Sequence, residues 1–368
     1  MILLSSIVTE FADQFLDRYK NTVLPGHVKA LNAMAQCRKE HGPHMLAQCI
    51  NHNCGKQTYI PHSCGHRICS HCQNHESQQW IENELNKLLP ARYYLITFTI
   101  PRQLRDLAWK NQKTIYSLMF ACVQDVLKTF TQNDKKLLGE AGFTTILHTH
   151  SRALDYHPHI HVVMPGASIN PNTRLWRVKS SRYIFNHQAL AIVFRAKFLE
   201  AIVANNLQVP KNCPKKWVVD CKDVGKGDKA LIYLGRYLYR GVIQEKDILK
   251  CENGMVTFRY RDSKTRRIQK RTVTGEYFLY LLMLHVLPKG FRRTRSYGFL
   301  HPCSKKLIML LQMILRVNPF KHLKQKKGRT KIVCPACGSE MKIIMTRLLP
   351  KPPDRLPACP INKGGIVM

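Results

Sequence analysis

The chain has 368 residues, in which 58 Lys and Arg stand against 23 Asp and Glu, so its formal net charge is +35 at neutral pH. Because 45% of the residues are hydrophobic, this charge belongs to a folded protein of two or three domains, which excludes a disordered basic tail. Nucleic acid is therefore the first partner to expect, and an anionic membrane surface the second.

The 14 cysteines are the other unusual feature of the composition. Only four residues precede Ser5, and the acidic residues Glu10 and Asp13 follow soon after. The sequence therefore predicts no apolar signal-peptide core. The longest apolar runs, 277–287 and 307–315, are shorter than the about 20 residues that cross a bilayer. We therefore expect a soluble protein of the bacterial cytoplasm, associated with the nucleoid and without a membrane partner. In a reducing compartment, clustered cysteines bind metal more often than they form disulfides.

Apolar periodicity predicts an α+β protein. The expected elements, in chain order, are helices at 7–19 and 80–89, a strand at 93–100, a helix at about 105–130, strands at 143–150 and 159–164, helices at about 188–205 and 228–240, and a basic β-ribbon at 256–273. Three domains follow: residues 1–90 as a zinc-binding DNA-recognition module, 91–285 as a catalytic domain and 286–368 as a basic DNA-binding extension.

Six cysteines lie close together near the N-terminus, at short chelating spacings that are typical of structural zinc. We assign Cys37, His44, Cys49 and Cys54 to one ion. Cys64, Cys69 and Cys72 are assigned to a second ion, with His62, His66 or His75 as its fourth ligand. The alternative is that these cysteines are free structural thiols.

A further pair, Cys334 and Cys337, resembles half of a zinc ribbon. A closed zinc site needs four ligands. Only Cys303 and Cys359 stand near this pair in the sequence, so its partners are missing. Metal binding by this pair is therefore left open.

Histidines mark the second of the two strands at 143–164. Because side chains alternate along a strand, His159 and His161 share one face while Ile160 and Val162 pack on the other. Two imidazoles at this spacing form half of a metal site. His148, on the preceding strand, is a candidate third ligand. The alternative is a pair of hydrogen-bonded histidines without a metal.

The helix at 228–240 combines an apolar face with a face of tyrosines and arginines. Leucines at 231, 234 and 238 form the apolar face, and Tyr233 and Tyr237 lie together on the other face beside Arg236 and Arg240. Core tyrosines with outward-reaching arginines are the alternative. Gly235, in the middle of this helix, costs about 1 kcal/mol relative to alanine and indicates the close approach of another group, such as a DNA backbone.

Together these patterns predict phosphoryl transfer. A tyrosine is a weak nucleophile at neutral pH unless cations and a Lewis acid assist it. A metal ion bound by His159 and His161 could polarise a scissile phosphate, while Arg236 and Arg240 stabilise the developing charge. The product would be a 5′-phosphotyrosine linkage and a free 3′-OH, and rejoining would need no ATP.

The motifs resemble a known family. The segments SCGHRICSHCQ, ILHTHSRALDYHPHIHVV, YLGRYLYRGVI and RTRSYGFLHP, in this order between about residues 10 and 305, are similar to those of rolling-circle insertion-sequence transposases. These are HUH endonucleases with two catalytic tyrosines. The resemblance implies Mg²⁺ or Mn²⁺ at His159 and His161, nucleophiles at Tyr233 and Tyr237, and an antiparallel sheet flanked by helices. It also implies single-stranded DNA of element ends and target as substrate, and an N-terminal zinc module.

Two alternatives remain open. One is another HUH enzyme, a replication initiator or a relaxase, and the other is a non-catalytic zinc-dependent DNA-binding regulator. No phosphate-binding GxxxxGK[ST] motif occurs, so no nucleotide cofactor is expected. The residues expected to contact DNA phosphates lie in the ribbon and in the segment 289–331, which has thirteen Lys and Arg and no acid. They are Arg259, Arg261, Arg266, Arg267, Lys270, Arg271, Arg292, Arg293 and Arg295.

Overall fold

The computed structural model describes residues 2–39, 42–170, 172–239, 241–262, 265–318 and 331–348. The chain divides into two units: a larger one of Met1–Met34 and Gly65–Lys327, and a smaller one of Ala35–Cys64 and Gly328–Met368. Within the described residues, no helix combines the length and the apolar character needed to cross a membrane.

The larger unit is built on an antiparallel sheet of five strands, which lie in the order β12, β4, β5, β3, β8. Their bounds are Tyr93–Thr99 for β3, Phe143–His150 for β4, Tyr156–Pro165 for β5, Val218–Asp223 for β8 and Thr294–Tyr297 for β12. The expected strands at 93–100, 143–150 and 159–164 are thus confirmed, and β5 begins earlier than expected.

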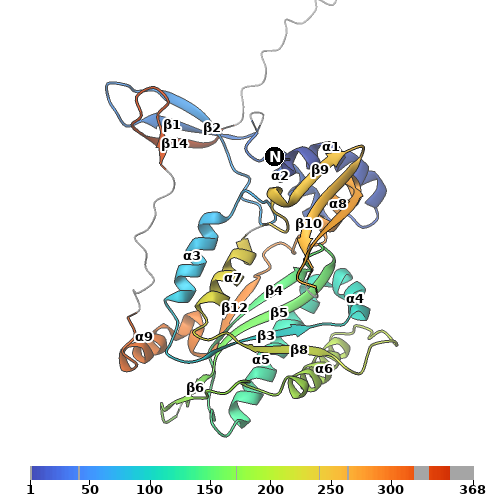
Figure 1. Ribbon diagram of the computed structural model, residues 1–368, viewed down its shortest axis with the longest axis vertical. Helices are drawn as coiled ribbons and strands as arrows, with labels where there is room; N and C mark the ends of the chain where they lie inside the picture. Colours follow the sequence, from blue (N-terminus) through green and yellow to red (C-terminus); the bar gives the residue numbers. More distant parts are fainter. Residues whose placement is uncertain are drawn as a thin grey trace, which may run out of the picture. The chain divides into compact units, whose positions relative to one another are not determined.

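One face of this sheet is covered by long helices. Ile96, Phe98 and Ile160 are fully buried, and the ring of Phe98 packs edge-on against Phe194 with ring centroids 5.1 Å apart. Figure 1 shows α5 and α6 on this side of the sheet. The helix expected at 105–130 is interrupted at Asn111, whose side chain bonds to the carbonyl of Leu107. The helices are α4 (Arg105–Lys110), α5 (Gln112–Asn133) and α6 (His187–Ala204).

The other face of the sheet is covered by α7 (Asp228–Tyr239), and α3 (Asn74–Leu85) packs beside α7 (Figure 1). Leu231, Leu234 and Leu238 of α7 are buried in one cluster with Tyr93 and Ile146 of the sheet. The predicted apolar face of this helix is therefore confirmed. Because side chains alternate on the strands, the same sheet face also carries the histidines of β4 and β5.

The basic ribbon at 256–273 forms the centre of a second antiparallel sheet, with the strand order β11, β10, β9. The ring of Phe258 on β10 packs against Phe278 of α8. Arg18 on α1 and Glu276 on α8 form an ion pair at 2.5 Å. The bounds are α1 Leu4–Tyr19, β9 Ile248–Glu252, β10 Met255–Arg261, β11 Ile268–Thr274 and α8 Gly275–Met283.

The remaining elements of this unit are short. They are α2 (Pro25–Ala35), which runs to the edge of the smaller unit, α9 (Lys305–Ile314), and a two-stranded sheet of β6 (Ala167–Ile169) and β7 (Trp176–Val178).

The smaller unit joins two segments that are far apart in the sequence. Its antiparallel sheet has the order β13, β14, β1, β2, so the C-terminal strand β14 pairs directly with β1. The bounds are β1 His44–Cys49, β2 Gln57–Pro61, β13 Ile332–Val333 and β14 Glu340–Leu348.

Candidate active site

Three histidines gather on the sheet face that α7 covers. His148 on β4 lies opposite His159 on β5, and His161 follows on the same face. The ring centroids are 5.2 Å apart for His148 and His159, 4.4 Å for His148 and His161, and 4.8 Å for His159 and His161. One nitrogen of each ring lies within 4.8 Å of the others. The structure therefore brings the candidate third ligand, His148, to the predicted pair.

The hydrogen bonds of these rings suit a metal site. Nδ1 of His159 donates to the carbonyl of His157 at 2.6 Å, and Nδ1 of His161 shares a bond with the Thr97 hydroxyl at 2.9 Å. Both bonds leave Nε2 for another ligand. Nε2 of His148 is buried and has no hydrogen-bond partner among the described residues. Imidazoles anchored through one nitrogen, with the other left over, are typical metal ligands. These residues therefore fit a divalent cation.

The pKa values of the three histidines also suit a metal site. Burial lowers the pKa of His159 to about 4. Burial, with the neighbouring charges of His161 and His159, lowers the pKa of His148 well below its usual value, and burial does the same for His161. All three imidazoles are therefore neutral at neutral pH, as metal ligands must be.

The two predicted tyrosines differ in their surroundings. Tyr233 is 47% exposed, whereas Tyr237 stacks on His148 with ring centroids 3.7 Å apart and on His150 with centroids 4.8 Å apart. The Tyr237 hydroxyl donates to the carbonyl of His150 at 3.2 Å. The two tyrosine rings are 6.3 Å apart. Tyr237 is thus the tyrosine that lies against the histidine cluster.

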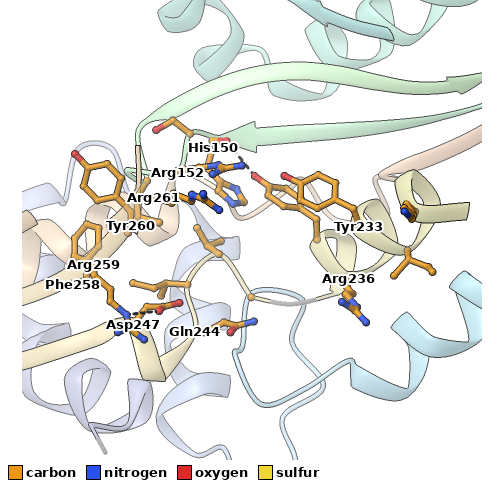
Figure 2. Close-up of a pocket in the computed structure, with 18 residues that line it drawn as sticks. His150, Arg152, Tyr233, Arg236, Gln244, Asp247, Phe258, Arg259, Tyr260 and Arg261 are labelled. Carbon is orange, nitrogen blue, oxygen red and sulfur yellow. Dashed lines mark hydrogen bonds and ion pairs between the residues drawn. The ribbon is translucent and has the colours of Figure 1, made fainter. Parts of the chain in front are cut away.

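Two arginines that helical spacing did not place beside the tyrosines act on Tyr237. Burial raises the pKa of the Tyr237 phenol, and the charges of Arg293 and Arg152 oppose that rise. Arg236 is exposed, and its guanidinium points away from the hydroxyl of Tyr233 (Figure 2). Arg240 lies outside the described residues. Helical spacing placed Arg236 beside the tyrosines, but it could not show which cations other elements bring to this face.

Gly235 marks a close approach of protein and not of DNA. A Cβ at this position would lie 2.3 Å from Cγ1 of Ile81 and 2.8 Å from Cε3 of Trp80, both on α3. The hydroxyl of Ser77 donates to the carbonyl of Gly235 at 2.9 Å. The expectation of a nearby DNA backbone is therefore wrong, because α3 occupies this surface of α7.

The first zinc assignment also needs correction. Cys49 and Cys54 group with Cys334 and Cys337, whose thiols lie within 4.8 Å of one another. His44 is not in this group, and its ring lies edge-on to Tyr59. The missing partners of the C-terminal cysteine pair are thus Cys49 and Cys54. The signal was present in the sequence as two incomplete pairs, but only the pairing of β14 with β1 joins them.

The other cysteines of the N-terminal region form a second group of potential ligands, Cys37, Cys64, Cys69 and Cys72. Cys37 therefore belongs to this group and not to the first. Because the group has four thiols, the expected histidine ligand is not needed, and none of His62, His66 and His75 is among its members.

Comparison with known proteins gives two family matches in the order of these sites. Residues 7–100 match the family described as "Transposase zinc-binding domain", and residues 142–307 match the family described as "Putative transposase". The protein named "Putative transposase y4qJ" of Sinorhizobium fredii is 32% identical over 270 residues, which cover 67% of this chain and 68% of that one. The chain belongs to the two-tyrosine transposase family.

A second relative of this transposase is the protein named "Transposase for insertion sequence element IS801" of Pseudomonas savastanoi, which is 25% identical over 74% of this chain and 70% of that one. Among solved structures, a metal-bound conjugative relaxase TrwC in complex with oriT DNA matches 61% of this chain and 72% of that one at 12% identity. Its TM-score is 0.27, and nothing below depends on this likeness.

The predicted DNA-contacting cations of the transposase fall into two sets. Arg259 pairs with Asp247 at 2.9 Å, Arg271 with Asp155 at 2.9 Å, and the Arg295 guanidinium lies 4.2 Å from the centre of the Phe120 ring. Nη1 of Arg293 donates to the carbonyl of Leu238 at 3.1 Å, at the end of α7. These four have structural contacts. The other five, Arg261, Arg266, Arg267, Lys270 and Arg292, are exposed, as Arg259 also is, and Arg261 in addition donates to the carbonyl of Arg266.

A cavity of about 600 Å³ opens beside the tyrosines of the transposase. It is lined by α7, by the turn after β4 and by β10 of the basic sheet (Figure 2). Tyr233 belongs to α7, Arg152 to the turn after β4 and Tyr260 to β10. The cavity thus connects the predicted nucleophiles with the basic ribbon.

Proposed function

We propose that this transposase nicks and rejoins single-stranded DNA at the ends of its mobile element, through a 5′-phosphotyrosine intermediate, in rolling-circle transposition. The observation that carries the proposal is the contact of Tyr237 with His148. It supports the proposal because the tyrosine that we propose as the nucleophile lies against one of three neutral imidazoles that suit a divalent metal.

Mg²⁺ or Mn²⁺ would be held by His148, His159 and His161, and it would supply charge that stabilises the scissile phosphate. The residues of the chain do the rest. The oxygen of Tyr237 attacks the phosphorus and loses its proton to solvent, the bond from phosphorus to the 3′ oxygen breaks, and that oxygen takes up a proton from solvent as it leaves. The DNA segment on one side of the break then remains attached to the tyrosine through its 5′ phosphate, and the segment on the other side ends in a free 3′-OH.

Two arginines act on the charge that would develop on the Tyr237 oxygen. The phenol of Tyr237 is neutral at rest because burial raises its pKa. Arg293 and Arg152 favour the phenolate, so they are the cations that would stabilise charge on the oxygen as the bond forms. Tyr233, which is exposed, would receive the second strand. The energy of the phosphodiester stays in the phosphotyrosine, so rejoining needs no nucleotide cofactor.

The two cysteine groups would each bind a structural Zn²⁺. Four thiolates form a closed tetrahedral site without an open position for chemistry. We therefore assign these ions to folding and to the shape of the DNA-recognition region.

The proposal is tested with the purified chain and a labelled single-stranded oligonucleotide that spans the end of the element. With Mn²⁺, the wild type is expected to form an SDS-resistant protein–DNA adduct. The variant with both Tyr233→Phe and Tyr237→Phe is expected to form none, whereas Tyr183→Phe, an exposed tyrosine outside the cavity, should retain it. An adduct that survives the double substitution would refute the assignment of the nucleophiles.

A further inference from the structure

The walls of the cavity beside Tyr233 combine aromatic rings and cations. Tyr260 on β10 lines it and is half-buried, and its ring centroid lies 6.4 Å from that of Phe258. Phe258 is 1% exposed and is held from behind by Phe278. The ring of Tyr260 therefore has a buried, packed aromatic ring as its neighbour. A flat ring held in this way is a surface on which a nucleobase can stack.

Five cations line the cavity, of which Lys229 and Arg236 belong to α7, and the other three are one paired arginine and two further arginines. Arg259 is neutralised by Asp247 at 2.9 Å. Arg152 follows β4, and Arg261 ends β10. Nε of Arg261 donates to the carbonyl of Arg266 at 2.8 Å, which orients the guanidinium without neutralising it. Figure 2 shows Arg152 and Arg261 close together beneath His150, on the side of Tyr260.

Another polar residue of the wall is Gln244, in the segment after α7. Its side-chain amide offers one acceptor and two donor hydrogens, as a nucleobase edge requires. A volume of about 600 Å³ suits one or two nucleotides and excludes a duplex. A site for phosphate alone would not need an aromatic ring in its wall, because phosphate does not stack.

We infer that this cavity receives unpaired nucleotides of the scissile strand, one base stacked on Tyr260 with the adjoining phosphates held by Arg152 and Arg261, and a neighbouring base read at its edge by Gln244. The inference rests on the proposed function, because Tyr233 and Tyr237, the proposed nucleophiles, line the same cavity. It makes Tyr260 and Gln244 determinants of the sequence that is cut, since only a base that can leave its stack and fit the cavity fills it.

The test is equilibrium binding of fluorescent single-stranded oligonucleotides that span the element end, without added Mg²⁺ or Mn²⁺, so that no strand is cut. In a series, each nucleotide near the cleavage position is replaced in turn by an abasic residue. One abasic position is expected to weaken binding by roughly five- to 150-fold, the range of one stacked base. Tyr260→Ala should weaken binding of the intact strand to the same extent and leave the strand with that abasic position unaffected.

Matched variants separate the ring from other effects. Tyr260→Phe keeps the stacking surface and should bind like the wild type. Ile268→Ala removes an exposed side chain of the same basic sheet outside the cavity, and it should also bind like the wild type. Gln244→Ala should change which base is preferred at a position next to the sensitive one, while the affinity for a strand that is abasic at that neighbouring position stays unchanged.

Other results would overturn the inference. If Tyr260→Ala and every abasic position weaken binding additively, the ring does not contact a base in this cavity. If free nucleoside monophosphates displace the strand as well as a matching oligonucleotide does, the cavity is a mononucleotide site. Failure of the proposed function is separate: the wild type would then form no adduct with Mn²⁺, whatever the binding series shows.

Discussion

The ring of Tyr237 lies nearly parallel to the imidazole of His148, with ring centroids 3.7 Å apart and planes inclined by 20°. One side chain comes from α7 and the other from β4, and α7 is fixed on the sheet by its buried leucines. The packing of the helix therefore also fixes the orientation of a proposed metal ligand. The proposed nucleophile and the proposed metal ligand thus position each other.

This contact predicts that Tyr237 affects metal affinity. Tyr237→Ala would free the His148 ring to rotate, and it should weaken Mn²⁺ binding about tenfold or more, as the loss of a supporting contact does in other metal sites. Tyr237→Phe keeps the ring and should bind Mn²⁺ normally. Tyr233→Ala is the control, because Tyr233 is largely exposed. Calorimetric titration with Mn²⁺ measures all three, and equal affinities would show that stacking does not hold the ligand.

The cysteine groups predict two zinc ions per chain. Cys334→Ser should remove one ion and leave the other, because it opens only the group shared with Cys49 and Cys54. His44→Ala should retain both ions. Elemental analysis of the purified variants gives the stoichiometry. Loss of zinc on His44→Ala would restore the ligand assignment that the structure corrects.

Gly235 predicts a packing defect. Gly235→Ala would place a methyl group 2.3 Å from Ile81, and such overpacking typically costs about 1–3 kcal/mol of unfolding free energy, enough to outweigh the better helix propensity of alanine. Gly26→Ala meets Val286 at 3.6 Å, an ordinary contact, and should be tolerated. Thermal unfolding measures both. In an Ile81→Ala background the cost of Gly235→Ala should shrink, and an unchanged cost would locate the strain elsewhere.

Buried histidines predict acid sensitivity. Burial lowers the pKa of His27 to about 4 and that of His285 to about 3, from about 6.5 in the unfolded chain. Between these values the unfolded chain binds protons that the folded chain does not, so the free energy of unfolding should fall as the pH falls from about 6.5 to 4.

His27→Phe should make this pH dependence shallower by up to one proton, because phenylalanine can keep the packing on Trp109 but cannot titrate. His75→Asn changes an exposed histidine and should leave the slope unchanged. Denaturant unfolding at several pH values gives the slopes. An equal dependence of the unfolding free energy on pH in His27→Phe and the wild type would contradict the lowered pKa of His27.

Local patterns predicted the elements of the fold well. The alternation of residues 143–150 defined β4 to the residue, and the leucines of α7 face the sheet as expected. Short-range spacing also identified the proposed nucleophiles and two of the three clustered histidines. These features depend on neighbours within a few residues, which the sequence displays directly.

Long-range partners could not be predicted in the same way. Cys54 meets Cys334 across 280 residues, and Arg293 influences Tyr237 from a segment that was expected only to contact phosphates. Gly235 was assigned to a DNA contact because nothing in its own helix indicates that α3 packs there. Strand pairing and helix packing decide these contacts, and a single sequence does not display them.

The central claim is that DNA becomes linked to a tyrosine of α7. Trypsin cleaves after Lys229, Arg236 and Arg240, so Tyr233 and Tyr237 fall on different peptides. The decisive measurement is mass spectrometry of the digested Mn²⁺-dependent adduct after nuclease trimming. We expect a nucleotide phosphate on Tyr237 within peptide 237–240 after the first cleavage. An adduct that lies on neither peptide 230–236 nor peptide 237–240 would contradict the account.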